Sequence, residues 1–446
     1  MTKIRAAALV TLAVLLAAPA AAEDLLQVYR EAQRYDAVFS AARNSLVAGR
    51  EKFPQGRALL LPNVTLTANA TRQQIDSAAH DASLAPFVNT ERYAYARGYT
   101  LTFSQPVLRL QNVAQYAQSE YQVKQAEATF GQAAQDLILR VAQAYFDVLA
   151  AQDSLGLVRA QKAAISEQLA QAKRNFEVGT ATITDTHEAQ ARFDLSSAQE
   201  IAALNDLENR RSALRQITGK EYAEFKPLRA DVKLAQPNPN DMQSWVDLAE
   251  KQGFPVQAAD ALREIAALEL KRNYAAHLPT VDFIASHQYA NQTGTVTSAV
   301  GNDLRINTIG FQLSMPLFQG GALFSRDREA AALSLKSRDD LDNARRNAAL
   351  TTRQSYLAVI NGIAQVGALE QARISSQSAL DSNKLGYEVG VRINIDVLNA
   401  QQQLYSTERD LSVARYNIIT NLLKLKAAAG SLIEQDLEEV NRALAP

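Results

Sequence analysis

The sequence contains no cysteine, only four histidines and a single tryptophan among its 446 residues. Without cysteine, the chain cannot use a disulfide framework, thiol catalysis, a zinc ribbon or a cysteine-ligated iron–sulfur cluster. Glycine is scarce as well, at 18 residues, and the hydrophobic fraction is 47%, which excludes collagen-like and disordered chains. Lysine and arginine together number 46, and aspartate and glutamate 47. Because these charges balance, we expect no nucleic-acid partner.

The first 22 residues have the pattern of a secretory signal peptide. Lys3 and Arg5 precede an apolar stretch over residues 6–18, and the alanines at 20–22 form an Ala-x-Ala cleavage site. A membrane anchor is the weaker interpretation, because the apolar stretch is shorter than the roughly 20 residues of a spanning helix. No later apolar run reaches that length. We therefore expect export, with any membrane contact made by strands or by a surface helix.

The rest of the chain consists of two copies of one unit. The motif FEVG at 176–179 recurs as YEVG at 387–390, and Asp185 recurs as Asp396. These pairs share one offset of 211 residues. A period of this length indicates a duplicated domain and not a solenoid repeat.

Each copy changes its hydrophobic period in the same order: a helix that ends at a proline, two alternating strands, a very long helix, and a second helix after a short glycine turn. Residues 220–240 contain three prolines and are interpreted as the linker between the copies. The predicted parts are a signal peptide at 1–22, a first repeat at 23–219, the linker at 220–240, a second repeat at 241–430 and a C-terminal segment at 431–446. The first repeat contains a helix from Asp24 to about Arg57, strands at about 63–72 and 93–105, and a long helix at about 107–176. The second contains a helix from Met242 to about His277, strands at about 280–289 and 304–315, and a long helix at about 322–386.

The predicted strands carry apolar side chains on one face, small and polar side chains on the other, and tyrosines toward their ends. An ordinary sheet over a soluble core is the alternative, but the long helices offer no apolar face wide enough to cover such a sheet. The pattern matches an outer-membrane β-barrel. Four strands cannot close a barrel, since the smallest such barrels have about 8. Several chains must therefore pool their strands, and three chains would supply about twelve.

Over nearly the whole mature chain, the sequence resembles the TolC family of outer-membrane channel proteins, which are the exit ducts of type I secretion and of drug efflux. The stretches that carry the resemblance are FEVGTATITD at 176–185, RQITG at 215–219, HLP at 277–279, YEVGVRINIDVLNA at 387–400, ARYNIITNL at 414–422 and LIEQDL at 432–437. The resemblance implies a mixed α and β membrane protein, a homotrimer whose twelve-stranded outer-membrane β-barrel continues into a periplasmic α-helical barrel. It also implies a location in the outer membrane of a Gram-negative cell, in contact with outer-membrane lipid. The implied partners are a periplasmic adaptor protein and an inner-membrane ABC or RND-type transporter.

The resemblance further implies which residues hold the periplasmic mouth shut. In the family, a tyrosine and an arginine of the second helical hairpin link to a threonine and an aspartate of the first. The matching residues, here called the gate residues, are Tyr387, Arg392, Thr184 and Asp185. Asp396 would form an acidic ring at the pore mouth, whereas Asn399 stands where other members carry a second aspartate. Helix capping and helix-dipole pairing are the alternative roles for these residues.

The sequence contains no Gly-x-Ser-x-Gly motif, no phosphate-binding loop and no His-Glu-x-x-His motif. Its histidines are scattered, so we expect no enzymatic activity, no metal and no cofactor. A passive export duct is the leading hypothesis, and a periplasmic adaptor or coiled-coil scaffold protein and an outer-membrane enzyme are the alternatives. Type I protein secretion and drug efflux both stay open as the route that the duct serves.

Overall fold

The computed structural model describes residues 23–78, 80, 83, 90–229, 236–294 and 300–445. The predicted signal peptide and parts of the segments between the two predicted strands of each copy lie outside these residues. The chain divides into two compact units. The first comprises the residues up to Ala42, Gln132–Gly253 and Ala348 onward, and the second comprises Arg43–Gly131 and Phe254–Asn347.

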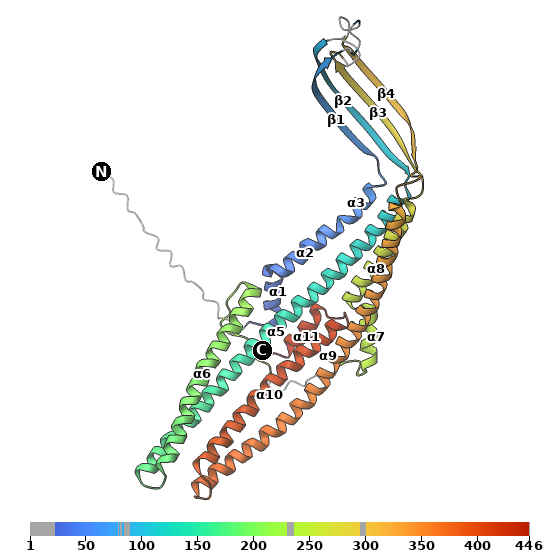
Figure 1. Cartoon of the computed structure of the whole chain (residues 1–446). Coiled ribbons are helices and arrows are strands. Elements are labelled where there is room, and N and C mark those ends of the chain that lie inside the picture. The colour runs from blue at the N-terminus through green and yellow to red at the C-terminus, as the bar shows by residue number, and fades with distance from the viewer. Residues whose placement is uncertain are drawn as a thin grey trace, which may run out of the picture. The chain divides into compact units, whose positions relative to one another are not determined.

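The predicted repeat of helix, two strands, very long helix and helix is confirmed, because the same series of elements occurs twice (Figure 1). The first copy contains α1 Leu25–Tyr35, α2 Ala37–Arg50, α3 Lys52–Ala58, β1 Asn63–Ser77, β2 Thr90–Leu108, α5 Leu110–Glu177 and α6 Ile183–Thr218. The second copy contains α7 Met242–Gln252, α8 Phe254–Ala275, β3 Thr280–Gln292, β4 Asn302–Ser314, α9 Ala322–Glu388 and α10 Asn394–Ala428, and α11 Glu434–Arg442 follows. Gly179 and Gly390, which lie 211 residues apart, have nearly equal positive φ angles of 78° and 79°. The duplication therefore extends to the backbone of single turns.

The helix predicted from Asp24 to Arg57 is in fact three helices, and the first break falls at Asp36. The backbone of Asp36 is extended, with φ −60° and ψ 117°. Its carboxylate accepts a hydrogen bond from the Phe39 backbone N–H at 2.9 Å and so caps α2. The same carboxylate accepts two hydrogen bonds from Arg140 of α5, at 3.1 and 2.6 Å. An aspartate that bonds to nearby backbone competes with the helix, and apolar periodicity does not report this competition.

The helix predicted from Met242 to His277 is likewise divided, into α7 and α8, by Gly253. Gly253 has an extended backbone, with φ −58° and ψ 126°. Pro255 follows in the first turn of α8, where a proline is tolerated. In a continuous helix its ring would clash with the carbonyl group of Lys251. The break therefore follows from the proline.

The four strands form one antiparallel sheet in the order β1-β2-β3-β4. They extend further than predicted at the end distant from the helices, where Ser77 of β1 still pairs with Thr90 of β2. The alternation of apolar and polar residues fades there because both faces of the sheet carry polar residues. The backbone hydrogen bonds between the strands nevertheless continue. β2 also passes through Pro106, with a register irregularity before Leu108, so that α5 starts later than predicted. Among the described helices, none is both long enough and apolar enough to cross a membrane.

The first unit has an aromatic core, here called the aromatic cluster. Its members are Tyr145, Phe146, Tyr222, Phe225 and Tyr416, whose neighbouring rings lie 5.5 to 5.7 Å apart. The Tyr145 hydroxyl donates to the backbone carbonyls of Glu23 and Lys226, at 3.1 and 3.0 Å. This core therefore ties the segments around Glu23 and Lys226 to α5 and α10.

The second unit packs α2 and α3 tightly against the first part of α5. A Cβ atom on Gly49 would lie 2.4 Å from the Cβ of Ala126, so only glycine permits this approach. At the base of the sheet, Arg109 binds the carboxylate of Asp282 through two hydrogen bonds, of 2.8 and 2.5 Å. This pair fixes the start of α5 to β3.

Candidate functional site: the helical-hairpin turns

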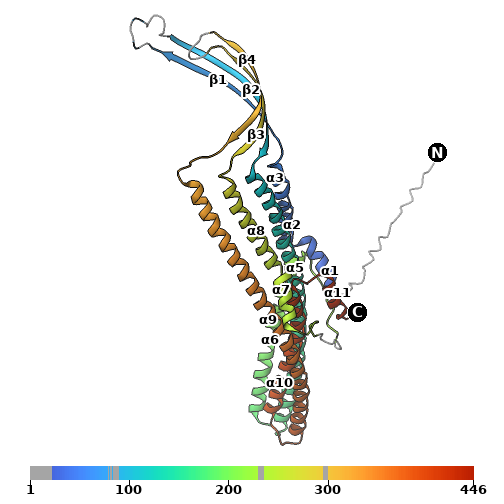
Figure 2. The same cartoon turned by 90° about the vertical axis from the view of Figure 1, so that its right-hand side faces the viewer.

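Two antiparallel helical hairpins, α5 with α6 and α9 with α10, have their turns next to each other in both views (Figures 1 and 2). Each turn closes with the same hydrogen bonds. The Thr180 N–H donates to the Asn175 carbonyl at 2.8 Å, and the Val391 N–H donates to the Gly386 carbonyl at 2.9 Å. With the positive-φ glycine in between, this is the helix-ending motif that favours glycine.

The first turn uses its aspartate as a local cap. Asp185 accepts hydrogen bonds from the backbone N–H and the hydroxyl of Thr182, at 3.0 and 2.9 Å. The Thr182 hydroxyl in return accepts a 3.3 Å bond from the Asp185 backbone N–H. This reciprocal arrangement is a capping box. The neighbouring Thr184 is exposed.

The second turn uses the equivalent aspartate differently. Its N-cap residue is Ile393, which has no side-chain hydrogen bond to offer. Asp396 instead pairs with Arg392 across 3.6 Å, with the arginine side chain 59% exposed. An exposed pair of this kind contributes only about 0.3–0.5 kcal/mol of stability. Because more than half of its side chain is exposed, Arg392 is accessible to a further acceptor.

Amide side chains join the two hairpins. Asn394, the first residue of α10, is completely buried. Its side-chain oxygen accepts a 2.6 Å hydrogen bond from Gln168 of α5, and its amide nitrogen donates to the backbone carbonyl of Asp185 at 3.4 Å. The Asn175 amide donates to the Tyr387 hydroxyl at 3.2 Å.

A guanidinium completes this contact further along the helices. Arg192 of α6 donates to Gln402 at 2.5 Å and to Asn399 at 2.9 Å, both on α10. We call the whole set the hairpin seam: Gln168, Asn175 and Arg192 of the first hairpin, with Tyr387, Asn394, Asn399 and Gln402 of the second.

Little apolar surface reinforces the hairpin seam. Leu398 of α10 is buried against Ile165, Leu169, Ala172 and Ala189 of the first hairpin. The other apolar cluster at this end, which includes Leu380, Val397 and Leu404, lies within the second hairpin. Net contributions of about 0.5–1.5 kcal/mol per hydrogen bond make the hairpin seam a set of individually weak contacts that can be broken in turn.

The structure brings some of the predicted gate residues to the hairpin seam. The Tyr387 hydroxyl of the second hairpin accepts a hydrogen bond from Asn175 of the first, and the Asp185 backbone carbonyl of the first hairpin accepts one from Asn394 of the second. Among the described residues of the single chain, Arg392 pairs with Asp396, and no hydrogen bond or ion pair joins it to Thr184 or Asp185.

Sequence reasoning missed Gln168, Asn175, Arg192, Asn394 and Gln402. A signal for Asn394 was present, since Ile183 of the first copy corresponds to Asn394 of the second. Gln168 and Asn175 also differ from their counterparts in the second copy, which are Ala379 and Gly386. A polar residue opposite an apolar one at equivalent positions is a sequence signal that the two copies have different contacts.

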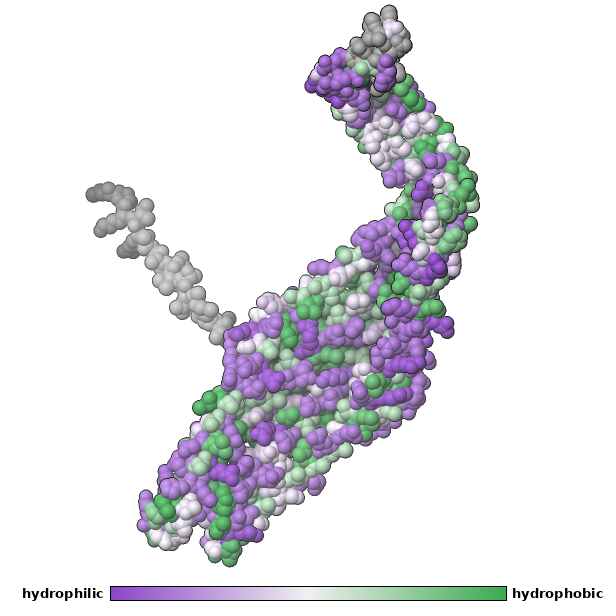
Figure 3. Space-filling model, in the orientation of Figure 1, coloured by the Kyte–Doolittle hydropathy of each residue, from purple (hydrophilic) through white to green (hydrophobic). Residues whose placement is uncertain are grey.

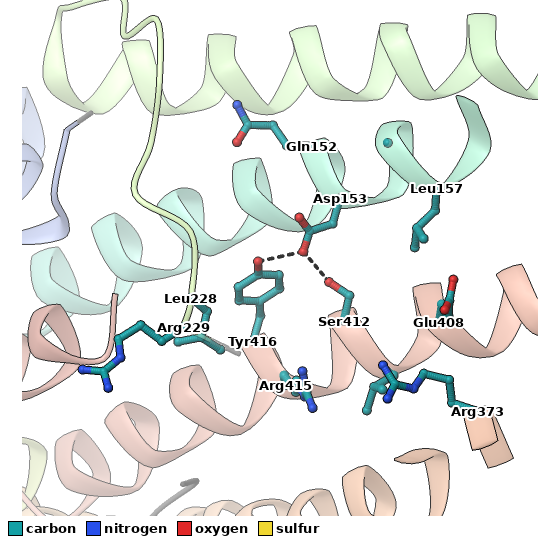
Figure 4. A pocket seen from close by; sticks show the side chains of 12 residues that line it. Gln152, Asp153, Leu157, Leu228, Arg229, Arg373, Glu408, Ser412, Arg415 and Tyr416 are labelled. Atoms are coloured by element: carbon teal, nitrogen blue, oxygen red, sulfur yellow. Dashed lines mark hydrogen bonds between the residues drawn. The ribbon is translucent and has the colours of Figure 1, made fainter. Parts of the chain in front are cut away.

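A concave region with a volume of about 470 Å³ lies between α5 and α10, further along the helices (Figure 4). The Asp153 carboxylate of α5 accepts hydrogen bonds from the Ser412 and Tyr416 hydroxyls of α10, at 2.5 and 2.8 Å. Burial, and next the charge of Asp153, raise the pKa of Tyr416, so its hydroxyl remains a donor. The described lining contains no histidine or cysteine. These contacts join two helices and do not form a nucleophile–base pair.

The part of the chain that the structure describes contains no group of three histidine, aspartate or glutamate side chains that could hold a metal ion. The chemistry of the hairpin turns is that of reversible hydrogen bonding between helices. Their arrangement suits mechanical opening and closing.

Comparison with known proteins gives consistent matches. The model of the outer membrane efflux protein family matches residues 28–220 and 245–431. Outer membrane protein TolC of Vibrio cholerae is 33% identical over 424 residues, which cover 95% of this chain and 94% of that protein. Alkaline protease secretion protein AprF of Pseudomonas aeruginosa is 33% identical over 433 residues, which cover 96% of this chain and 88% of that protein.

Among solved structures, the outer membrane protein VceC of Vibrio cholerae has a TM-score of 0.77, with 19% identity, covering 91% of this chain and 96% of that one. At this identity, the likeness is one of fold. It covers both repeats.

Proposed function

Because the chain belongs to the outer membrane efflux protein family, we propose that three copies of it form a closed exit duct that opens at the hairpin turns. Proteins of this family are transport channels and not enzymes, and this chain is accordingly an outer-membrane channel of a tripartite export system. Its location is the outer membrane of a Gram-negative cell.

The observation that carries the homotrimer is the sheet. Within the described chain, β1 pairs only with β2, and β4 pairs only with β3, so the sheet has two edges. An open edge cannot lie in lipid, where its N–H and C=O groups would have no partner. Edge-to-edge pairing of three sheets closes a barrel of about twelve strands, within the known range that starts at about 8.

The two faces of the sheet support this assignment. One face carries exposed apolar side chains, among them Leu66, Leu101 and Phe311. The opposite face carries small and polar residues such as Thr67, Thr100 and Gln288. The first face suits lipid and the second suits a water-filled lumen. The long helices then extend into the periplasm, with the turns at Gly179 and Gly390 at the far tip.

The hairpin turns are the gate of the proposed duct. In the closed state, the hairpin seam holds the two hairpins of each chain together. Tyr387 and Arg392 are proposed to link, in addition, to Thr184 and Asp185, and Asp396 to line the mouth of the pore. Individually weak hydrogen bonds suit this role, since a docked complex must supply the energy that opens them.

The proposed partners are a periplasmic adaptor protein and an inner-membrane transporter. Identity of 33% over 96% of the chain to a protease secretion protein favours protein secretion, and with it an ABC-type transporter. An RND-type transporter and small-molecule efflux form the second candidate, and cross-linking followed by identification of co-purified inner-membrane proteins distinguishes the two.

Oligomeric mass tests the closed duct. The protein extracted in detergent is expected to have the protein mass of a trimer, measured by light scattering with the detergent contribution subtracted. A stable, fully folded monomer would exclude the pooled barrel.

Orientation is tested with two matched cysteine variants. Val300, next to the β3–β4 loop, is 78% exposed, and Val391, in the α9–α10 turn, is 76% exposed. The native chain has no cysteine that could react. On intact cells, Val300→Cys is expected to react with a membrane-impermeant maleimide and Val391→Cys only after the outer membrane is permeabilised. The opposite labelling pattern would show that the proposed orientation in the outer membrane is wrong.

A further inference from the structure

The apolar face of the sheet ends in a band of tyrosines. Register places directly opposed residues of neighbouring strands on the same face. On that face, exposed apolar side chains occupy the half of the sheet nearer the helices, and they are Val64, Leu66, Leu101, Ile309, Phe311 and Leu313. Tyr99 and Tyr289 follow toward the strand tips, with ring centroids 5.8 Å apart, and Tyr95 and Tyr93 come next on β2. Figure 3 shows hydrophilic residues at the strand tips and hydrophobic residues further down the sheet.

Three arginines share the depth of these tyrosines. Arg72 is directly opposite Tyr95, Arg305 is directly opposite Tyr289, and Arg97 lies on β2 between Tyr95 and Tyr99. All three arginines are exposed. The Arg72 guanidinium carbon lies 4.3 Å from the centre of the Tyr93 ring, and that of Arg305 lies 5.9 Å from the centre of the Tyr289 ring.

Stacking leaves the guanidinium donors available. A guanidinium over an aromatic face keeps its N–H groups at its edge, where they can bind a phosphate through two parallel hydrogen bonds. Strands about 4.8 Å apart, with a rise of about 6.8 Å per two residues, put the Cα atoms of Arg72 and Arg97 about 8 Å apart. Two long arginine side chains at that separation can contact the same headgroup.

Acidic residues on this face lie beyond the arginines or are already engaged. Asp76 and Glu91 are directly opposite each other and lie nearer the strand tips, four residues along β1 from Arg72. Asp303 of β4 is separated from Arg97 of β2 by Asn291 of β3, which is directly opposite both residues. Its carboxylate accepts hydrogen bonds from Asn291 and Tyr289 at 2.5 and 3.4 Å. The positive charge is therefore closest to the tyrosine band.

We propose that Arg72, Arg97 and Arg305 form a binding surface for the phosphate groups of the outer-leaflet lipid. The assignment rests on the proposed function, which places this face against lipid and its tips outward. Tyrosines at a membrane boundary lie at headgroup depth. Arginine matches phosphate geometry through two donors, and its long stem reaches from the apolar zone to the headgroup.

The test compares phosphorylated with dephosphorylated lipid. Trimer purified in detergent is titrated with diphosphorylated lipid A, and separately with the same lipid after enzymatic removal of its phosphates, and bound lipid is counted by native mass spectrometry. The wild type is expected to bind the phosphorylated form more tightly. Replacing all three arginines by glutamine is expected to weaken that binding roughly a hundredfold, at about fivefold per arginine, and each single variant by about fivefold. The dephosphorylated lipid should bind all variants equally.

A matched control removes the same number of positive charges, but from helix α9 and not from the strands. Arg328, Arg338 and Arg345 are exposed on α9, and the triple glutamine variant there is expected to bind lipid A like the wild type. The proposal is overturned if the strand variants bind as the wild type does, if both lipids bind equally to the wild type, or if the α9 control loses as much affinity. Competition by inorganic phosphate would assign the arginines to a free anion and overturn the lipid assignment.

Channel formation separates this proposal from the proposed function. All variants are expected to form trimers and to conduct ions in planar bilayers. If the wild type conducts but shows no preference for phosphorylated lipid, only the headgroup assignment fails. If neither the wild type nor the Tyr387→Phe/Asn394→Ile variant, which lacks bonds of the hairpin seam, conducts, the exit duct itself is wrong.

Discussion

The helices of the first unit are held together in two different ways along their length. Around the aromatic cluster, large buried rings stack, and the Asp36 carboxylate is held by Arg140. At the hairpin seam, the two hairpins meet through amide hydrogen bonds, the Arg192 guanidinium and a small apolar cluster around Leu398. The first kind of packing is costly to open and the second is not. A duct that must open at one end without unfolding requires this difference.

The largest expected effect comes from the aromatic cluster. Phe146 is 1% exposed and packs against Tyr145 and Tyr416. Phe146→Ala is expected to lower the free energy of unfolding by about 3–5 kcal/mol, because it leaves a cavity in a dense core. Phe193→Ala near the hairpin turn, where the ring is only partly buried, is expected to have no more than about half that effect. Thermal unfolding followed by circular dichroism measures both, and equal losses would remove the distinction between the two regions.

Asp36 gives the next largest effect, and it depends on pH. Hydrogen bonding to Arg140 is the main reason that the pKa of Asp36 lies below its ordinary value. Because the folded-state pKa is depressed, the stabilisation is present above the ordinary aspartate range and is lost as pH falls through the folded-state pKa. Asp36→Asn is expected to cost about 2 kcal/mol at neutral pH. The difference from the wild type should shrink below the ordinary aspartate range of about 4, and a difference that is constant from neutral to acid pH would contradict this.

The two turns can be made alike by exchanging their caps. Thr182→Ala removes a side-chain cap and should weaken the local stability of the first turn by about 1 kcal/mol. Ile393→Thr should create the missing cap, with Asp396 in the position that Asp185 has in the first turn, and should stabilise the second turn by a similar amount. Hydrogen exchange of the turn amides measures both changes. If Ile393→Thr leaves exchange unaltered, Asp396 is committed to Arg392.

Arg392 has the smallest expected effect on stability. Its exposed pair with Asp396 is worth only about 0.3–0.5 kcal/mol, so Arg392→Ser should leave thermal unfolding almost unchanged. Single-channel conductance should nevertheless rise if the guanidinium also links to Thr184 or Asp185 in the closed trimer. Unchanged conductance would reduce Arg392 to a local partner of Asp396.

Much of the fold could be predicted from the sequence, because the repeat and the change of hydrophobic period are long-range patterns that single residues do not disturb. The breaks at Asp36 and Gly253 escaped prediction, since they depend on one carboxylate's partners and on one proline. The strand tips escaped too, because backbone pairing continues where side chains no longer alternate.

The site was predicted only in part, for a different reason. Tyr387 and Asp185 stood out as copy differences or as charged residues near a glycine turn. Gln168 and Asn175 also differ between the copies, where Ala379 and Gly386 are their counterparts. They escaped prediction because an amide in a long helix normally faces solvent, and only three-dimensional packing reveals the partner. Asn394 was visible as the counterpart of Ile183, but a neutral amide attracts less attention than a charge.

Single-channel conductance of a variant without the central bonds of the hairpin seam tests the account most directly. Tyr387→Phe removes the hydroxyl that Asn175 binds, and Asn394→Ile gives the second copy the residue that the first copy has. Asn383→Ile is the matched control, since the Asn383 amide bonds to the Ala379 carbonyl within its own helix. We expect both variants to form trimers, with a moderate loss of thermal stability in the Tyr387→Phe/Asn394→Ile variant because the buried Gln168 amide loses its partner. Conductance in planar bilayers should rise for this double variant and stay at the wild-type level for the control. Wild-type conductance of the double variant, or an equal rise in the control, would contradict the account.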